Sequence, residues 1–302
     1  MAGINVKCEI LNIKERNMRK LIMIALAMAI PMLGMAKKEK VTNVRWCTYN
    51  MRCINKGDTE KGVGWDSRKD RACQWVLDND IDVVGMQEVT HQQLLDILER
   101  LPQFDYVGVG RTDGKEGGEY TPVLFRKDKY KALSRGNFWL SETPDSAGSK
   151  GWDAALPRVA SWVKLKDLAT GKVFMAVNTH FDHVGKVARI ESAKLIMQKI
   201  QEIVGDKPAA VTGDFNITDT NPAYATMVGS KFVMRDAYYM SPQHEGVRYS
   251  FHAYSTIPPS QAHKIDFIFV TPQIEVLRTG IPKDNPDAPL SDHSPHWADL
   301  QF

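Results

Sequence analysis

Short apolar runs and longer amphipathic stretches alternate along the chain from residue 41 to its end. The short runs predict strands, and the stretches with apolar residues three or four positions apart predict helices. Strands are expected at 44–49, 81–86, 106–110, 122–126, 159–166, 173–179, 209–212, 264–270, 275–279 and 296–302. Helices are expected at 65–79, through Leu94 and Leu98, and from about Val187 to Val204. This alternation is typical of an α/β fold.

Four long polar connections separate the predicted elements, at 53–64, 111–119, 141–157 and 241–263. A strand or helix resumes directly after each of them, so none has the character of a linker between domains. Loops of this length usually carry function. The pattern therefore predicts one domain with elaborated loops.

The first 36 residues differ from the rest of the chain. Arg19 and Lys20 precede an apolar run over 21–35, and Gly34 and Ala36 place small residues at its end. This is the layout of a secretory signal peptide, with translation starting at Met18. The alternative is an uncleaved membrane anchor, but the run is short for a spanning helix and contains Pro31. We expect an extension and signal peptide over 1–36, and a single exported domain over 37–302, periplasmic or secreted, without a membrane span.

Charge and composition narrow the class of protein. The chain of 302 residues has 39 basic and 36 acidic side chains, and residues 1–36 hold five of the former and two of the latter. The remaining 266 residues therefore balance 34 positive charges against 34 negative ones. A strongly basic nucleic-acid-binding protein is excluded, and a hydrophobic share of 43% excludes a disordered chain.

Four cysteines occur, at positions 8, 47, 53 and 73. Their spacing, and that of the histidines, matches no zinc site. Cys47 and Cys53 could form a disulfide or remain free, and free buried thiols are the expected state. We do not expect the cysteines to carry the function.

Polar residues cluster at the ends of six predicted strands. Each cluster alone has a structural explanation, as a turn or a helix cap. Their repetition at one strand end after another favours a functional site instead. The segments, in order, are Thr48-Tyr49-Asn50-Met51-Arg52, Gln87-Glu88-Val89, Asn178-Thr179-His180, Gly213-Asp214-Phe215-Asn216, Lys264-Ile265-Asp266 and Ser291-Asp292-His293.

This ordered set resembles the endonuclease/exonuclease/phosphatase superfamily of metal-dependent phosphoesterases. The resemblance covers 41–302, and the ordered set is far more specific than any one motif. Gly118-Glu119-Tyr120 and Pro157-Arg158 are similar to segments of secreted bacterial members and of the deadenylase-like and sphingomyelinase-like branch. The resemblance implies a four-layer α/β sandwich, in which two mixed sheets pack face to face with helices outside.

The resemblance also implies a metal site and a set of catalytic residues. Asn50 and Glu88 would hold Mg²⁺, or Mn²⁺, because an amide and a carboxylate oxygen suit these ions. His293 is the candidate base for the attacking water, and Asp292 or Asp266 would orient its ring. Asp214 and Asn216 would position the nucleophile and a phosphoryl oxygen, and His180 would donate to the scissile phosphate or to the leaving oxygen.

Two further residues are assigned with structural alternatives beside them. Arg158 could bind a phosphoryl oxygen as a fixed fork, or it could form an ion pair. Tyr120 could donate to the phosphate, or it could be a tyrosine at the edge of the core. Asp182 and His183 extend the His180 cluster, although a hydrogen-bonded loop explains them equally well.

These observations predict a divalent-metal-dependent phosphodiesterase or phosphatase that acts outside the cytoplasm on a small or lipid-linked phosphoester, most simply as a monomer. The alternative is a secreted endo- or exonuclease. Nucleic acid is not the favoured partner, because phosphate-backbone binding needs many lysines and arginines and the mature chain has no excess of them. A catalytically inactive binding module is a third possibility, but it predicts loss of at least one of Asn50, Glu88, Asp214 or His293, and all four are present.

Overall fold

The computed structural model describes residues 14–20, 40–229 and 234–302. Residues 14–20 are helical and exposed, and Val41–Phe302 form one compact unit. The predicted signal peptide lies largely outside the described residues. Within the described ranges, no helix combines the length and the apolar character that crossing a membrane requires.

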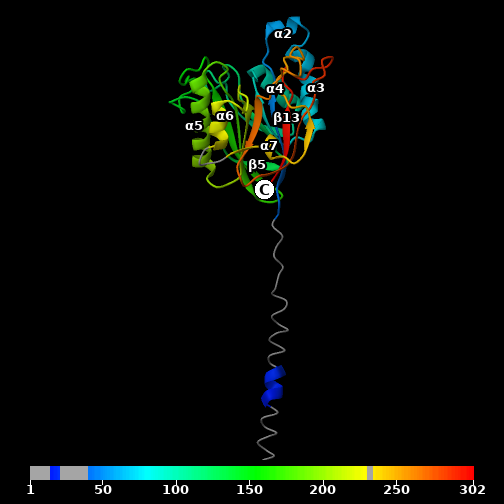
Figure 1. Cartoon of the computed structure of the whole chain (residues 1–302), viewed down its shortest axis with the longest axis vertical. Helices are drawn as coiled ribbons and strands as arrows, with labels where there is room; N and C mark the ends of the chain where they lie inside the picture. The colour runs from blue at the N-terminus through cyan, green and yellow to red at the C-terminus, as the bar shows by residue number, and fades with distance from the viewer. Residues whose placement is uncertain (1–13, 21–39, 230–233) are drawn as a thin grey trace, which may run out of the picture. The chain divides into compact units, whose positions relative to one another are not determined.

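Strands and helices alternate through the compact unit (Figure 1). The strands are β1 Asn43–Asn50, β2 Val83–Gln87, β3 Phe104–Val107, β4 Val123–Arg126, β5 Tyr130–Trp139, β6 Val159–Asp167, β7 Val173–His180, β8 Ala209–Asp214, β9 Arg235–Asp236, β10 His244–Gly246, β11 Asp266–Val270, β12 Glu275–Ile281 and β13 His296–Gln301. The helices are α2 Lys56–Glu60, α3 Trp65–Asp78, α4 His91–Arg100, α5 Lys186–Val204, α6 Pro222–Gly229 and α7 Ala237–Met240.

The strands form two mixed sheets. One has seven strands in the order β10-β12-β13-β1-β2-β4-β3, and the other has six in the order β5-β6-β7-β8-β11-β9. In the first sheet β1 runs parallel to β2 and antiparallel to β13. In the second sheet β8 runs parallel to β7 and antiparallel to β11. The carboxyl ends of β1, β2, β7 and β8 therefore lie at the same edge of their sheets as the amino end of β11.

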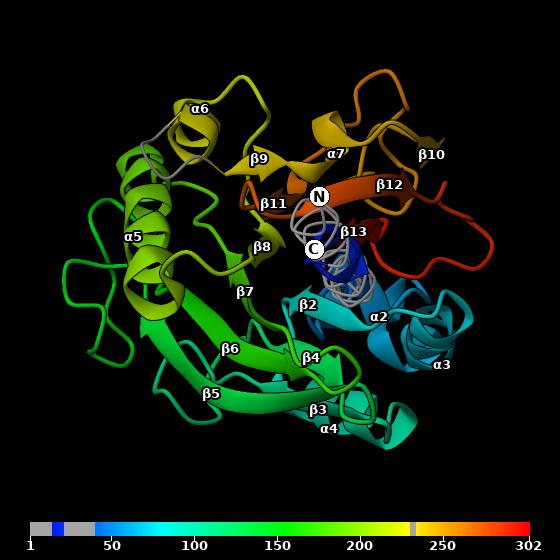
Figure 2. The same ribbon diagram turned by 90° about the horizontal axis from the view of Figure 1, so that it is seen from below.

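Three buried clusters show that the molecule has four layers. Residues of both sheets, including Trp46 and Phe174, share the central cluster between the sheets. The outer face of the six-stranded sheet packs on α5 and α6, and the outer face of the seven-stranded sheet packs on α3 and α4. Figure 2 shows these helix pairs outside the two sheets. The predicted α/β sandwich is confirmed.

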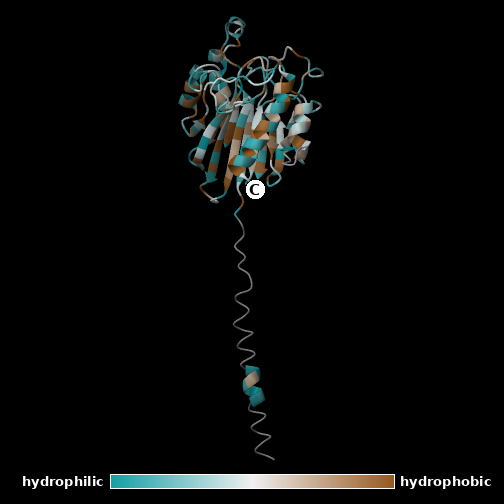
Figure 3. Cartoon of the chain, turned by 90° about the vertical axis from the view of Figure 1, so that its left-hand side faces the viewer, coloured by the Kyte–Doolittle hydropathy of each residue, from teal (hydrophilic) through white to brown (hydrophobic). Residues whose placement is uncertain are grey.

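The period-two alternation of the strands also explains where the polar residues lie. On β1, Val44 and Trp46 face the central cluster, and the same face ends in Asn50. On β8, Ala210 occupies that face and Asp214 ends it. The strands in Figure 3 accordingly carry bands of contrasting hydropathy along their length. One continuous face thus changes from core to polar site within a single strand.

The two sheets approach closely beneath that polar end. A Cβ on Gly85 would lie 2.1 Å from Thr212 Oγ1 and 2.4 Å from Asn178 Oδ1, so only glycine fits there. The close approach allows Gln87 Nε2 to donate to Asn178 Oδ1 at 2.7 Å and to Thr48 Oγ1 at 3.0 Å. The bond to Asn178 joins one sheet to the other, and the bond to Thr48 ties Gln87 to the neighbouring strand of its own sheet, so the two together fix the strand ends.

The sequence pattern missed several elements. The strand β5 was not predicted, because most of its central residues are exposed or half-buried and show no apolar alternation. The short elements α2, α6, α7, β9 and β10 fall in predicted loops or between predicted strands.

Cys47, Cys53 and Cys73 are free, so the alternative of a Cys47–Cys53 disulfide is wrong in this structure.

Candidate active site

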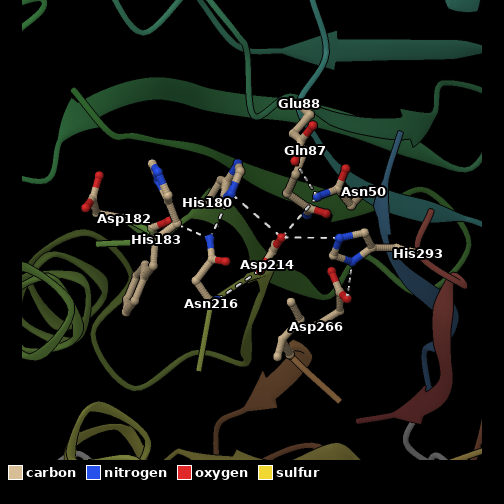
Figure 4. A network of polar contacts seen from close by, with 12 residues as sticks. Asn50, Gln87, Glu88, His180, Asp182, His183, Asp214, Asn216, Asp266 and His293 are labelled. Carbon is tan, nitrogen blue, oxygen red and sulfur yellow. Dashed lines mark hydrogen bonds and ion pairs between the residues drawn. The ribbon is translucent and has the colours of Figure 1, made fainter. Parts of the chain in front are cut away.

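The polar strand ends meet around one pocket of about 370 Å³ (Figure 4). Pairing places Asn50 opposite Gln87, and places Asp214 opposite both His180 and Asp266. Of the residues predicted from the sequence, those that line the pocket are Glu88, Arg158, His180, Asp214, Asn216, Asp292 and His293. Asn50 and Asp266 lie behind that lining and bond to it.

Asp214 is at the centre of this arrangement. Its Oδ1 accepts from the backbone N–H of Asn216 at 2.9 Å, and its Oδ2 accepts from Asn50 Nδ2 at 3.0 Å. The same Oδ2 lies 3.7 Å from His180 Nε2 and 3.8 Å from His293 Nε2. Burial and the charge of nearby Asp266 raise the pKa of Asp214, against the opposing charge of His293.

His293 is held by a carboxylate on the side away from Asp214. Its Nδ1 lies 2.8 Å from Asp266 Oδ2, so Nδ1 carries a proton and Nε2 faces the pocket. Burial opposes a charge on the ring, but Asp266, Asp292 and Asp214 outweigh it and raise the pKa of His293. Of the two orienting residues that the sequence left open, the structure places Asp266 in contact. The Asp292 carboxylate instead lies near Ser291 Oγ and 3.6 Å from Arg52 Nη1.

His180 lies on the other side of Asp214 and has a different environment. Asn216 Nδ2 lies 3.0 Å from His180 Nε2 and also donates to the carbonyl of Phe181. Because an amide NH₂ only donates, Nε2 accepts and the proton belongs on Nδ1. That Nδ1 is buried, has no hydrogen-bond partner among the described residues, and lies 3.8 Å from Glu119 Oε2. Burial, together with the charges of Arg158 and Arg111, holds the pKa of His180 well below its usual value.

The acidic side of the pocket suits a divalent cation. One group of possible ligands is Glu88, His180 and Asp214, and a second is Asp214, Asp266 and His293. Burial and then the like charges of Asp266 and Glu88 raise the pKa of Asp214, and a bound cation would relieve that repulsion. Carboxylate oxygens are the ligands that Mg²⁺ and Mn²⁺ prefer. The residues present therefore fit the predicted metal.

The role predicted for Asn50 needs a change of side-chain orientation. Its Nδ2 donates to Glu88 Oε1 at 3.1 Å and to Asp214 Oδ2, while its Oδ1 accepts from the N–H of Arg52 at 2.9 Å. The amide thus presents its NH₂ group to both carboxylates and holds them together. To bind a metal through oxygen, the amide would have to turn and release the Arg52 N–H.

Three residues at this site have left-handed backbone conformations. Their φ angles are 54° at Arg52, 58° at Glu88 and 50° at Asn216. Such conformations cost about 1–3 kcal/mol each and persist where surrounding contacts determine them. At Glu88 those contacts are the pairing of Val89 with Tyr120 and the capping box that starts α4 at Thr90. The strained turn aims the Glu88 carboxylate at the pocket.

Arg158 lies at the end of the pocket beyond His180. It is 4% exposed, with Nε 3.4 Å from Asp182 Oδ2 and Nη2 3.0 Å from His183 Nδ1. Its Nη1 is buried and has no partner in the described chain. The ion-pair alternative is therefore present, and it leaves one donor for a bound oxyanion. Asp182 also accepts the backbone N–H groups of residues 155, 156, 184 and 185, which makes it a loop anchor.

Tyr120 does not line the pocket. Its ring is 3% exposed in the cluster beneath α3 and α4, and its hydroxyl lies 3.0 Å from His91 Nδ1. The prediction that Tyr120 binds phosphate is corrected on this ground, and the alternative of a tyrosine at the edge of the core holds. The pairing of Tyr120 with Val89 places its neighbour, Glu119, in the pocket wall.

Sequence reasoning missed two arginines that line the pocket. Arg111 forms a bidentate ion pair with Glu119, at 2.8 and 2.9 Å. Arg52 bonds Asp58 through Nε at 2.8 Å and borders Asp292. The available signals were the position of Arg52 two residues after Asn50 and the glycine-rich stretch around Arg111. Neither signal distinguishes a site arginine from a surface one.

Comparison with known proteins agrees with this geometry. The model of the endonuclease/exonuclease/phosphatase family matches residues 47–293. A crystal structure of an endonuclease/exonuclease/phosphatase from Bacteroides vulgatus is 54% identical, covers 86% of this chain and 98% of its own, and has a TM-score of 0.84. A mannosyl-6-phosphatase from Bacteroides thetaiotaomicron is 38% identical, with coverages of 86% and 100% and a TM-score of 0.80.

A more distant relative is Nocturnin of Drosophila melanogaster. It is 22% identical over 246 residues, which are 70% of this chain and 37% of that protein. The chain spans little more than a third of the length of the curated relatives it matches.

Proposed function

The chain belongs to the endonuclease/exonuclease/phosphatase family, and on that premise we propose that it hydrolyses a small phosphomonoester with the help of Mg²⁺ or Mn²⁺. One observation carries the proposal. A single pocket joins an acidic side, around Asp214, to a side with an unpartnered buried guanidinium donor, on Arg158. A phosphoryl group bridging a cation and a guanidinium would satisfy both sides.

The size of the pocket and one relative favour a small ester. A volume of about 370 Å³ is at the lower end of the range for small-molecule sites. The relative named as a mannosyl-6-phosphatase is 38% identical to this chain and covers 86% of it. Sugar phosphates are therefore the first substrates to test.

The side chains on the acidic side of the pocket have separate roles in the proposed reaction. Glu88 and Asp214 would hold the cation, which supplies charge to offset that of the phosphoryl oxygens. Asp266 fixes the ring of His293 with Nε2 beside Asp214. With a cation on Glu88 and Asp214, less carboxylate charge would face the ring, the pKa of His293 would fall, and Nε2 could then take a proton from the attacking water.

On the other side, His180 and Arg158 supply donors for the phosphoryl group. Asn216 holds His180 in the tautomer whose proton is on Nδ1, and Asp182 with His183 holds the Arg158 fork. Both donors are fixed before substrate binds, which is the arrangement that stabilises developing charge most effectively.

The test is release of inorganic phosphate from p-nitrophenyl phosphate and from hexose 6-phosphates. We expect activity with added Mg²⁺ or Mn²⁺, loss of activity in EDTA, and recovery when the metal is restored. Glu88→Gln should abolish turnover at ordinary metal concentrations, whereas the exposed Glu60→Gln should not. Activity that persists in EDTA and in Glu88→Gln would contradict the metal-dependent mechanism.

The same assay separates the phosphatase from a nuclease. Bis-p-nitrophenyl phosphate, single-stranded DNA and RNA would be offered beside the monoesters, with a salt titration. Preference for the monoesters supports the proposal. Faster cleavage of a nucleic acid, with steep salt dependence, would identify a nuclease instead.

We also propose that the domain acts outside the cytoplasm. The support is the basic pair and apolar run of residues 19–35, followed by the small residue Ala36. Expression of the full chain followed by cell fractionation and N-terminal sequencing would test it. Mature protein beginning after residue 36 is expected, and a cytoplasmic protein retaining its first residues would contradict export. A monomeric state remains a prediction for the same preparation.

A further inference from the structure

Arg68, on α3, is a fully buried arginine whose side-chain hydrogen bonds go to backbone carbonyls. Its exposed fraction is 0%, and it does not line the pocket of the candidate site. Its Nε donates to the Val63 carbonyl at 2.8 Å, and its Nη2 donates to that of Arg52 at 3.2 Å. Its Nη1 donates to the carbonyls of Met51 at 3.1 Å and Leu290 at 2.8 Å. One guanidinium group therefore binds three separate segments of the chain.

Aromatic rings also hold this guanidinium. Its central carbon lies 5.6 Å from the centroid of the Trp65 ring and 5.9 Å from that of the Tyr254 ring. Tyr254 is in turn fixed, because it lies in a run of left-handed backbone conformations at 253–255 and its hydroxyl donates to Asp58 Oδ2 at 3.2 Å. A lysine could not replace Arg68 here, since an ammonium group is compact and cannot span acceptors on three segments.

The first segment that Arg68 binds positions the carboxylate of Glu88. Arg52 follows Asn50 by two residues, and its N–H donates to Asn50 Oδ1 at 2.9 Å. The next N–H, that of Cys53, donates to Glu88 Oε2 at 3.2 Å. The backbone at 51–53 therefore decides where the Asn50 amide and the Glu88 carboxylate lie.

Another segment that Arg68 binds leads directly to His293. Leu290 precedes the motif 291–293, so the bond from Arg68 Nη1 fixes the backbone at the point where this motif starts. Asp266 fixes the orientation of the His293 ring. The position of that ring relative to the first segment depends on the backbone contact as well.

The spacing of these two segments matters because both bring a side chain to the same carboxylate oxygen. Asn50 Nδ2 lies 3.0 Å from Asp214 Oδ2, and His293 Nε2 lies 3.8 Å from it (Figure 4). In the proposed reaction the attacking water lies between His293 and the carboxylates of Asp214 and Glu88. A misplacement of about 1 Å between reacting groups can lower a rate about 10²-fold. Turnover should therefore depend on the distance between the segments.

We propose that Arg68 is a positioning residue, whose guanidinium holds the segment after Asn50 and the segment before His293 at the spacing that the reaction requires. Arg68 contacts neither the substrate nor the reacting atoms, and it acts through His293. The inference rests on the role proposed for His293, and it is independent of which phosphoester is the substrate.

The experiment compares Arg68→Lys with Arg71→Lys. Arg71 lies on the same helix and donates to the carbonyls of Pro289 and Ser67, so it contacts the same loop as Arg68 without a bond to residues 51–52 among the described contacts. At saturating Mg²⁺, Arg68→Lys should lower kcat on the best monoester by about ten- to a hundredfold and change KM by less than about threefold. Arg71→Lys should keep both values of the wild-type protein.

The expected difference between kcat and KM has a structural reason. His180 and Arg158 are the proposed donors to the phosphoryl group. Asn216 holds the first and Asp182 holds the second, and neither contact involves the segments that Arg68 binds. Binding of the phosphoryl group should therefore survive the substitution. Thermal unfolding of both lysine variants would show whether either one has lost stability in addition.

A double-mutant cycle separates positioning from a general structural effect. In a His293→Ala background no base remains to be positioned, so adding Arg68→Lys should lower kcat further by less than about threefold. General damage to the fold would lower kcat by the same factor in both backgrounds. If Arg68→Lys does not fold, Arg68→Gln takes its place in the cycle, because it also lacks the fork but leaves no unmatched buried charge.

A second measurement needs neither metal nor turnover. In protein labelled with ¹⁵N-histidine, the ring signals of His293 are identified by their absence from the spectrum of His293→Ala. These signals should shift in Arg68→Lys, because the ring moves relative to Asp266 and Asp214. They should keep their positions in Arg71→Lys. Unchanged His293 signals in Arg68→Lys would contradict the inference.

The possible results separate this inference from the proposed function. If Arg68→Lys turns over a monoester as fast as wild type, or loses equal activity with and without His293, the positioning role is wrong although the phosphatase stands. If wild-type protein cleaves a diester or a nucleic acid in place of the monoesters, the proposed function fails, and the same cycle on that substrate still tests Arg68. If no ester is cleaved, both proposals fail.

Discussion

His180 and His293 flank Asp214 at nearly equal distances, with their Nε2 atoms 3.7 and 3.8 Å from its Oδ2, yet their environments are opposite. His293 has carboxylates around it, and these raise its pKa. His180 has two arginines nearby and is buried, and both factors lower its pKa. Two copies of one side chain, sharing one neighbour, are thereby prepared for different protonation states.

The partners of the two rings differ in the same sense. Asp266 accepts the Nδ1 proton of His293 and leaves Nε2 toward Asp214. Asn216 donates to Nε2 of His180 and leaves the Nδ1 proton on the side of Glu119, whose Oε2 lies 3.8 Å from Nδ1. The comparison shows that the side chains behind each ring, rather than the histidines themselves, divide the site into a side that favours a charged ring and a side that favours a neutral one.

The strongest test of this division is to remove the ring on the acidic side. His293→Ala should lower kcat on a phosphomonoester by about 10²- to 10⁴-fold, because the group that accepts the proton of the attacking water is lost. The measurement is steady-state phosphate release at saturating Mg²⁺. His244→Ala changes an exposed histidine and should have no effect. A loss below tenfold for His293→Ala would mean that another group is the base.

A smaller effect is expected from the carboxylate behind His293. Asp266→Asn should lower kcat by about ten- to a hundredfold, because an amide no longer stabilises the charged ring or fixes its tautomer. Asp292→Asn should lower it much less, since Asp292 lies near Arg52 and Ser291 instead of bonding the ring. Equal losses in the two variants would show that both carboxylates orient His293.

On the other side, replacing the donor should have a moderate effect. His180→Ala should lower kcat/KM by about tenfold to a hundredfold, the loss expected when one positioned donor to the phosphoryl group is removed. Arg158→Lys should act in the same direction, because lysine cannot keep the contacts to Asp182 and His183 while offering a further donor. Activity of His180→Ala equal to wild type would remove the donating role.

A third buried histidine, His296, extends the comparison, because its lowered pKa can be tested through the pH dependence of the free energy of unfolding. His296 bonds Thr279 Oγ1 and the Asp266 carbonyl, faces no carboxylate in those contacts, and has a pKa lowered to about 3, chiefly by burial. Its folded pKa is below the unfolded value of about 6.5, so its stabilising contribution is present above pH 6.5 and is lost as the pH falls toward 3.

The measurement is the free energy of unfolding by denaturant at pH 6.5 and pH 5.5. Wild-type protein should lose up to about 1.4 kcal/mol over this unit through His296. His296→Gln should start less stable but lose correspondingly less over the same interval. His263→Gln is the exposed control and should keep the wild-type slope. A slope in His296→Gln equal to that of wild type would contradict the assignment.

Much of the fold follows from local pattern. Strands β1, β2, β7 and β8 carry runs of apolar residues and were predicted to within about two residues. The strand β5 lacks that pattern, because it is supported by pairing with β6 more than by burial of its own side chains. The capping box at Thr90 and the apolar spacing of α5 are likewise local features.

The residues of the candidate site, like the elements of the fold, are predictable from the sequence only in part. Asn50, Glu88 and Asp214 are recognisable because polar residues end apolar strands, and His293 because a polar segment directly precedes the last strand, and both are features of the sequence alone. The choice of Asp266 over Asp292 as the partner of His293 depended on distances across two strands and a loop. Tyr120 lies outside the pocket and Arg111 lines it. Both positions depend on the path of the loop between β3 and β4, which the sequence pattern does not predict.

By itself, the sequence determined which chemical groups the protein has, the alternation that gives each strand one apolar face, and the strand end at which that face becomes polar. Only the tertiary structure decided that His180 and His293 have pKa values shifted in opposite directions and that Arg111 and Glu119 share one pocket. The reason is physical. Alternation is a property of neighbouring residues, whereas pairing and electrostatic interaction depend on distances between residues far apart in the chain.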